Sequence, residues 1–291
     1  MSTTFRIDAH IAAPPAAVYE ALTDRAALET WLAEHADVDL ANGRYAFWGR
    51  DVPMTRDGGH QRLLDHEPDH RLRLAWEQDG TDTEVEIVLE PDGDGTKLTL
   101  TQSESPDWAG DLAGVRDFWH LRMLALTEHV EGRPPVPRYD FTRTHGGEAR
   151  VEVDIDAPVD RVFASLVEPD QVERWFHTDT TPQIEPRVGG RYDMGWDNGP
   201  IKILEIDPPH VLSYGWSNEG QDDTVVRWEL EGSQGRTHLT LVHSGFAEGR
   251  PANGYEIGWT NLLHSIKRMH ELGDAWQRID FSELADAPTT R

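Results

Sequence analysis

The chain has 291 residues, of which 37% are hydrophobic, and it contains 11 tryptophans and no cysteine, so disorder, a disulfide scaffold and thiol chemistry are excluded. Its net charge of −26 is spread over both halves, which argues against nucleic acid and anionic membranes as partners. No stretch reaches the roughly 20 apolar residues of a membrane span or forms a signal-peptide core, so we expect a cytoplasmic protein.

The first half of the chain opens with an alternating strand over residues 5–11, whose apolar side chains share one face. Ala13-Pro14 ends this strand, and helical spacing predicts a short helix over 16–22 and a second one that carries Trp31. An apolar stripe over 119–130 predicts a longer closing helix. Between them, turn signals separate predicted strands at residues 44–48, 61–64, 71–76, 84–89 and 97–102.

The same order of elements recurs in the second half. Residues 149–176 repeat the pattern of 5–32, and a closing helix is predicted over 259–269. The strands between them are predicted at 191–196, 201–206, 211–216, 224–230 and 237–243. A repeat this long is a domain rather than a solenoid unit of about 20–50 residues. We therefore predict domains over 1–131 and 148–283, a stiff Pro- and Gly-containing linker over 132–147 and a tail over 284–291.

Short motifs recur in the same order in both halves. In the second half they are Ala157-Pro158-Val159, Glu173-Arg174-Trp175-Phe176, Gly189-Gly190-Arg191-Tyr192 and Gly258-Trp259. The more diverged first half has Ala13-Pro14, Trp31-Leu32, Gly43-Arg44-Tyr45 and Asp117-Phe118-Trp119. This ordered set resembles the START-like (SRPBCC) superfamily, and within it the branch named after the C-terminal domain of the Hsp90 ATPase activator.

The resemblance implies an α+β protein of two tandem helix-grip domains, in each of which a curved antiparallel sheet and a long C-terminal helix enclose a cavity. Such cavities in this superfamily hold lipids, polyketides, hormones or other apolar molecules. Strand alternation predicts the inward-facing side chains, and a concave aromatic surface with a few polar groups is typical of a small-molecule site. The competing interpretation is that these side chains only fill a core. The predicted lining is Met194, Trp196, Tyr214, Trp216, Trp228, His243 and Trp259 in the second domain, and Tyr45, Phe47, Trp76, Gln102 and Trp119 in the first.

Histidines are the candidate catalytic groups. His243, and less directly His120, could act as a general base if it opens on a cavity, and is otherwise a hydrogen-bonded core histidine. His66 and His70 have a spacing that makes a metal pair only on a helix, and here they fall in a predicted turn, so we expect no metal site. The sequence has no nucleophile elbow, phosphate-binding glycine loop or dinucleotide fingerprint, so we expect no cofactor.

We expect the protein to bind a small hydrophobic or aromatic ligand in one or both cavities. The alternative is an enzyme, such as a cyclase, dehydratase or hydrolase acting on a polyketide-like substrate, because aromatase/cyclases include two-domain arrangements of this fold. A second alternative is an interaction protein that stimulates a chaperone ATPase, as the namesake of the branch does. We expect neither nucleic acid nor membrane as a partner, and the sequence gives no support for a particular protein partner.

Overall fold

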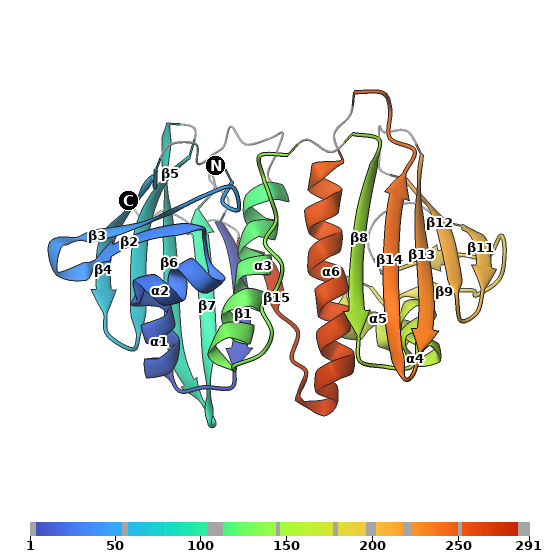
Figure 1. Ribbon diagram of the computed structural model, residues 1–291, viewed down its shortest axis with the longest axis horizontal. Helices are drawn as coiled ribbons and strands as arrows, with labels where there is room; N and C mark the ends of the chain where they lie inside the picture. Colours follow the sequence, from blue (N-terminus) through green and yellow to red (C-terminus); the bar gives the residue numbers. More distant parts are fainter. Residues whose placement is uncertain are drawn as a thin grey trace. The chain divides into compact units, whose positions relative to one another are not determined.

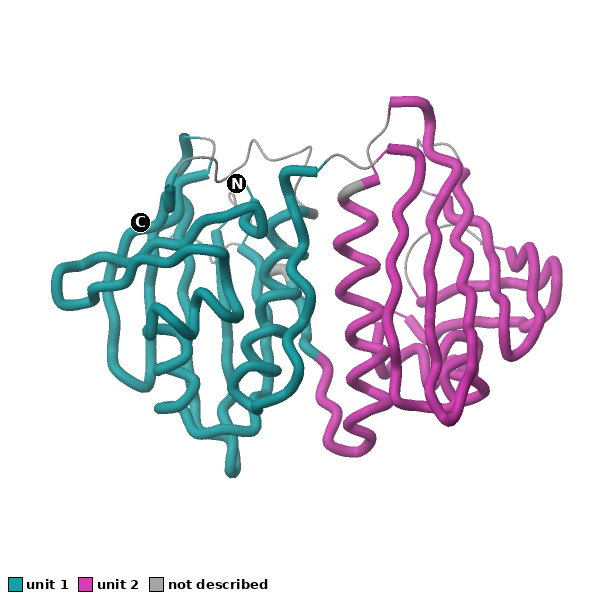
Figure 2. The backbone as a smooth tube through the Cα atoms, viewed as in Figure 1, with its two compact units in different colours: residues 1–143, 279–291 teal, residues 144–278 magenta. Residues whose placement is uncertain are grey.

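The structure, a computed structural model, describes residues 4–53, 58–78, 80–103, 113–143, 146–176, 180–195, 202–217, 223–249 and 252–284. The chain forms two compact units, shown in different colours in Figure 2. Unit 1 consists of Met1–Arg143 together with Ile279–Arg291, and unit 2 consists of Thr144–Arg278. Each unit has the predicted order of a strand, two short helices, antiparallel strands and a long helix, so the α+β helix-grip prediction is confirmed.

Unit 1 is built from β1 (Thr4–Ile11), α1 (Pro15–Thr23), α2 (Arg25–Trp31), β2 (His35–Asp39), η1 (Leu40–Asn42), β3 (Arg44–Trp48), β4 (Gln61–Glu67), β5 (Arg71–Gln78), β6 (Thr81–Asp92), β7 (Gly95–Ser103), α3 (Ala113–Val130) and β15 (Asp280–Leu284) (Figure 1). The strands pair in the order β15-β1-β7-β6-β5-β4, with all neighbours antiparallel, and β2 pairs with β3. Apolar residues of this sheet and of α3 form one core.

Unit 2 is built from β8 (Glu148–Ile155), α4 (Val159–Val167), α5 (Pro169–Trp175), β9 (Gln183–Ile184), β10 (Tyr192–Asp193), β11 (Ile203–Asp207), β12 (Val211–Trp216), β13 (Thr224–Ser233), β14 (Arg236–Ser244), α6 (Asn253–Leu272) and η2 (Gly273–Ala275) (Figure 1). Its strands pair in the order β11-β12-β13-β14-β8, and β9 pairs with β10. Along β14, Leu239, Leu241 and His243 are buried, which confirms the predicted inward face.

The recurring motif residues make the same hydrogen bonds in both units. These bonds fasten the short helices and the strand after the Gly-Arg-Tyr motif to the rest of each unit, so the motifs recur because the fold needs them. The indole Nε1 of Trp31 donates to the carbonyl of Ala21 at 2.9 Å, and that of Trp175 donates to the carbonyl of Ser165 at 2.8 Å. Tyr45 Oη donates to the carbonyl of Leu22, and Tyr192 Oη to that of Leu166, both at 2.8 Å. Thr96 Oγ1 donates to the carbonyl of Ala13, and Thr237 Oγ1 to that of Ala157, both at 2.7 Å.

The glycine of the Gly-Arg-Tyr motif is required for a different reason in each unit. Gly43 has a φ of +70°, in the left-handed region that glycine adopts without strain. Gly190 has no room for a side chain, because a Cβ there would lie 2.2 Å from the carbonyl oxygen of Glu185.

The C-terminal strand β15 completes the sheet of unit 1. It runs antiparallel to β1, with Leu284 opposite Thr4. The ring of Phe281 stacks on Phe5 with centroids 5.8 Å apart, and the guanidinium of Arg116 lies over both rings. The predicted second domain ended at residue 283, whereas Ile279 onward groups with unit 1. Without β15, β1 would leave a row of backbone groups unpaired at the sheet edge. The rest of the predicted tail, 285–291, lies outside the described residues.

The first part of the predicted linker packs on unit 1 instead of forming a free spacer. Val136 is buried, and Tyr139 and Phe141 pack against the core of unit 1. The backbone N–H of Phe141 donates to the carbonyl of Arg50 at 2.8 Å. Unit 1 therefore extends to Arg143, beyond the predicted end of its closing helix.

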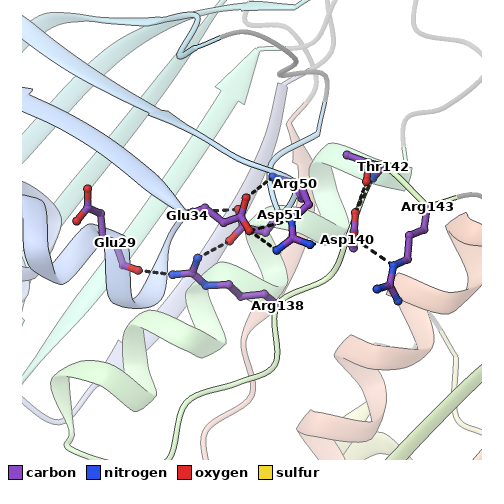
Figure 3. A network of polar contacts seen from close by, with 8 residues as sticks. All are labelled: Glu29, Glu34, Arg50, Asp51, Arg138, Asp140, Thr142 and Arg143. Atoms are coloured by element: carbon purple, nitrogen blue, oxygen red, sulfur yellow. Dashed lines mark hydrogen bonds and ion pairs between the residues drawn. The ribbon is translucent and has the colours of Figure 1, made fainter.

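A polar network fixes the same segment, as Figure 3 shows. Arg138 forms an ion pair with the buried Asp51 at 3.0 Å and donates to the carbonyl of Glu29 at the end of α2. Arg50 pairs with Glu34 at 2.6 Å. Burial raises the pKa of Asp51 although Arg138 opposes the shift, so this ion pair is partly shielded from water.

In the described ranges, no helix combines the length and the apolar character needed to cross a bilayer.

Candidate functional site

The predicted lining residues of unit 1 come together on the inner face of the sheet. Trp76 of β5 meets Phe47 of β3 edge-on, with ring centroids 5.3 Å apart, and meets Trp119 of α3 at 5.9 Å and an interplanar angle of 89°. Phe118, which the sequence analysis did not name as lining, fills the space between them, 5.1 Å from Trp119 and 5.8 Å from Trp76. Tyr45 joins the group through Phe47, at 6.4 Å. These edge-to-face contacts give unit 1 a rigid aromatic wall.

A chain of hydrogen bonds crosses this wall in unit 1. Trp119 Nε1 donates to Gln102 Oε1 at 2.6 Å, which links the closing helix to β7. Gln102 Nε2 donates to Thr83 Oγ1 on β6 at 3.1 Å, and Thr83 Oγ1 donates to the carbonyl of Trp76 at 2.9 Å. The predicted Gln102 is thus the central link between the sheet and α3.

The same chain exists in unit 2, with His243 in the place of Gln102. Trp259 Nε1 of α6 lies 3.1 Å from His243 Nδ1, and Thr224 Oγ1 lies 2.7 Å from His243 Nε2. Thr224 Oγ1 donates to the carbonyl of Trp216 at 3.2 Å. Because the indole N–H is a donor and the Thr224 proton is used, His243 accepts at Nδ1 and donates from Nε2, which assigns it the neutral Nε2–H tautomer.

The two histidines proposed as bases differ in their surroundings. His243 is fully buried, and the bonds to Trp259 and Thr224 use both of its ring nitrogens, so a proton transfer would require one bond to break. His120 follows Trp119 on α3 and lies outside the hydrogen-bond chain. Burial lowers the pKa of His120 to about 4, so it is neutral at pH 7.

The remaining lining residues of unit 2 form a second aromatic wall. Trp228 lies edge-on to Trp259 at 5.8 Å, and its Nε1 donates to Tyr214 Oη at 3.2 Å. Tyr214 in turn lies 4.0 Å, Oη to Sδ, from Met194. Burial raises the pKa of the Tyr214 hydroxyl, which is therefore a neutral hydrogen-bonding group. Trp196 lies outside the described residues.

Two half-buried aromatic residues, which the sequence analysis missed, continue this wall toward solvent. The rings of Phe246 and Tyr255 lie 4.7 Å and 4.5 Å from the ring of His243, and 5.1 Å from each other. Tyr255 is one helical turn before Trp259, and this i, i+4 spacing is the signal that could have placed it on the inner face of α6. We call the connected set Trp228, Trp259, His243, Phe246 and Tyr255 the aromatic row of unit 2.

Unit 1 contains buried hydrogen-bond donors that the sequence analysis also missed. Among the described residues, no acceptor bonds to Gln61 Nε2, Trp76 Nε1 or Gln78 Nε2, although these residues are only 7%, 0% and 1% exposed. An unsatisfied buried donor costs about 1–3 kcal/mol of stability. The sequence signal for these donors was the position of two glutamines on the same inward face as Trp76. Gln61 of β4 pairs with Trp76, and Gln78 is two residues after Trp76 on β5.

The histidine spacing considered for a metal site has a structural explanation. His66 Nδ1 lies 2.8 Å from Tyr19 Oη, and His70 Nδ1 lies 3.1 Å from the carbonyl of Leu89. His210, at the matching turn of unit 2, bonds the carbonyl of Leu230 in the same way at 3.0 Å. Within the described part of the chain, no group of three or more His, Asp or Glu side chains is placed to hold a metal ion.

The sequence matches one family model twice. The model is described as "Activator of Hsp90 ATPase homolog 1-like protein", and it matches residues 12–131 and again residues 156–271. The first match lies within unit 1 and the second within unit 2. A comparison with curated proteins gave no match.

Several solved structures are similar to the chain. Protein MLL2253 from Mesorhizobium loti is 26% identical to this chain, with a TM-score of 0.38. The alignment covers 44% of this chain and 98% of that protein. CalU16 from Micromonospora echinospora is 28% identical over 42% of this chain and 73% of its own, with a TM-score of 0.38. DynU16, a protein of the dynemicin biosynthetic locus, is 19% identical over 92% of this chain and 98% of its own, with a TM-score of 0.36. At these TM-scores the likenesses add nothing to the family match.

Proposed function

Because the chain belongs to the family of Activator of Hsp90 ATPase homolog 1-like proteins, with one copy of the family fold in each unit, we propose that it binds a small apolar or aromatic molecule between sheet and closing helix. The observation that carries this proposal is the aromatic row of unit 2. It runs from the buried Trp228 through Trp259 and His243 to the half-buried Phe246 and Tyr255 without a break.

Such a row suits a flat apolar guest for two physical reasons. Aromatic rings bind other rings by edge-to-face and offset contacts, and they lose little conformational freedom in doing so because they have few rotatable bonds. Phe246 and Tyr255 leave part of this surface in contact with water, so a guest that covers them removes apolar area from solvent. The net charge of −26 repels anions, which disfavours an anionic guest.

The geometry supports binding better than catalysis. His243, the strongest catalytic candidate of the sequence, is held by Trp259 and Thr224 as a structural link between the sheet and α6. Stimulation of the Hsp90 ATPase is what the family description says of its namesake. The aromatic row is buried except at the half-buried Phe246 and Tyr255, and it gives a role in docking on another protein no specific support.

The proposal is tested with N-phenyl-1-naphthylamine, a neutral apolar dye that fluoresces when it leaves water. We expect saturable binding to the full chain, weakened about tenfold or more in a Phe246→Ala, Tyr255→Ala double variant, because both ring contacts are lost. Tyr139→Ala is the matched control. Tyr139 is also a partly buried ring that packs on another aromatic side chain, Phe141, but it does not belong to the aromatic row of unit 2.

Unchanged dye affinity in the double variant contradicts the proposal, as does an equal loss in Tyr139→Ala. Native mass spectrometry of the purified chain gives an independent reading, because a bound apolar molecule adds its mass to that of the protein.

A further inference from the structure

We infer that the interior of unit 1 recognises a neutral carbonyl group, so that the preferred guest is an apolar molecule with a ketone, ester or amide oxygen held by the N–H groups of Gln61, Trp76 and Gln78. This inference rests on the proposed function, and it adds the unit and the chemical group by which a guest is selected. We call these N–H groups the donor cluster.

The donor cluster lies on one face of two neighbouring strands. Gln61 of β4 is directly opposite Trp76 of β5, and cross-strand partners have Cβ atoms about 4.5–5.5 Å apart. Gln78 is two residues beyond Trp76 on β5, so its side chain points to the same face about 7 Å away. All three side chains are buried, so this face is the inner one, and the strand register makes the three side chains neighbours on it.

The hydrogen bonds already present determine that the free groups are donors. Gln61 Oε1 accepts from the backbone N–H of Phe47 at 3.0 Å. Gln78 Oε1 accepts from Gln102 Nε2 at 3.4 Å, and Gln102 is itself oriented by the indole of Trp119. Flipping either amide would place its Nε2–H group against the N–H group that now donates to its Oε1. The partner that this interior requires is therefore a hydrogen-bond acceptor.

The charge of the surroundings selects a neutral acceptor over a carboxylate. The donors are amide and indole groups, and the side chains bonded to them or to their network, Thr83 and Gln102, are also neutral. A buried anion without a countercharge is strongly disfavoured, whereas a carbonyl oxygen accepts two hydrogen bonds without carrying charge. The adjacent rings of Phe47, Trp76 and Phe118 provide the apolar surface for the rest of such a molecule.

Two matched pairs of probes test the inference on the full chain: 9-fluorenone against fluorene, and acetophenone against ethylbenzene. Each pair differs mainly in one carbonyl oxygen. We expect at least one ketone to bind about tenfold tighter than its hydrocarbon and to shift the indole N–H resonance of Trp76 in a ¹H–¹⁵N spectrum, assigned with Trp76→Phe.

The variant Gln78→Met removes donors while keeping the length and volume of the side chain. We expect it to reduce the ketone preference, measured as the ratio of ketone to hydrocarbon affinity in the same variant, to about twofold or less. Leu74→Met is the control, because Leu74 is buried on the same face of β5 and carries no donor. Trp76→Phe provides a second test that keeps an aromatic ring if Gln78→Met disturbs folding.

The outcomes separate this inference from the proposed function. The inference is overturned if neither ketone is preferred, or if fluorene-9-carboxylate binds tighter than 9-fluorenone. It is also overturned if the N–H protons of Trp76 and Gln78 show magnetisation transfer to bound water both with and without ketone. Each of these results leaves the proposed function intact if N-phenyl-1-naphthylamine still binds through Phe246 and Tyr255. If the Phe246→Ala, Tyr255→Ala variant binds the dye as tightly as the wild type while the ketone preference is retained, only the site proposed in unit 2 is overturned.

Discussion

At the scale of single residues, Gln102 and His243 show that one position in this fold can be filled by chemically different side chains. Each accepts the indole N–H of the tryptophan in the closing helix and donates to a threonine on the next strand. The position therefore requires an acceptor and a donor at opposite ends of one planar group. A basic nitrogen is not needed for this role, since an amide meets the same requirement in unit 1.

This equivalence predicts how His243 tolerates substitution. We expect His243→Gln to retain both bonds and His243→Leu to leave the Trp259 N–H without its acceptor, so the leucine variant should lose about 1–3 kcal/mol more of the free energy of unfolding than the glutamine variant. Urea unfolding followed by tryptophan fluorescence measures the difference. Equal losses in the two variants would show that the hydrogen bonds of His243 contribute nothing to stability.

His270 of α6 predicts a dependence of stability on pH. Its pKa is lowered to about 4, first by burial and then by Arg174 and Arg161, against the opposite effect of Glu271. The unfolded chain takes up this proton near pH 6.5 and the folded chain only near pH 4, so the contribution to stability is full above pH 6.5 and is lost as the pH falls toward 4.

The test compares the loss of unfolding free energy between pH 7 and pH 5 in the wild type and in His270→Gln. We expect a smaller loss in the variant, because the group that protonates on unfolding has been removed. His238→Gln is the control, since the His238 side chain on β14 is half-buried and 43% exposed. The same loss in wild type and His270→Gln would contradict the pKa direction.

At the scale of elements, β15 joins the sheet of unit 1 from the opposite end of the sequence. Its pairing with β1 converts what would be a sheet edge into an interior strand, and Phe281, which is opposite Ile7, stacks on the diagonal neighbour Phe5. The segment 134–143 acts similarly, because Val136 and Arg138 bind it to unit 1. Both segments belong to unit 1 through contacts with residues far away in the sequence.

The contribution of β15 is measured with Phe281→Ala. We expect the unfolding free energy of unit 1 to fall by about 1–2 kcal/mol, because the half-buried ring loses its contact with Phe5 and Arg116. Amide hydrogen exchange should accelerate in β1 and stay unchanged in β8 of unit 2. Ser282→Ala, an exposed neighbour on the same strand, is the control, and unchanged exchange in β1 would contradict a stabilising role of β15.

At the scale of the whole molecule, the chain repeats one fold but divides its chemistry. Unit 1 has a glutamine-rich interior with free donors at Gln61 and Gln78, whereas unit 2 has the aromatic row that ends at Phe246 and Tyr255. The proposed guests of the two units therefore differ in the group that is recognised. Unit 1 also uses both ends of the chain, since it includes Ile279–Arg291.

The sequence by itself determined the order of elements, the family and the inward faces of the strands. These features depend on local periodicity and on motifs such as those of Trp31 and Trp175. Because the chain is a repeat, each element and motif occurs twice in the sequence. Burial of Leu239 and Leu241 follows directly from the alternation along β14.

Only the tertiary structure decided where β15 pairs, that 134–143 packs on unit 1, that both nitrogens of His243 are engaged, and that Gln61 and Gln78 keep unpaired donors. Each of these depends on which atoms meet across dozens of residues of chain. Spacing along a strand fixes the direction of a side chain, but it does not fix its partner, because the partner comes from another element.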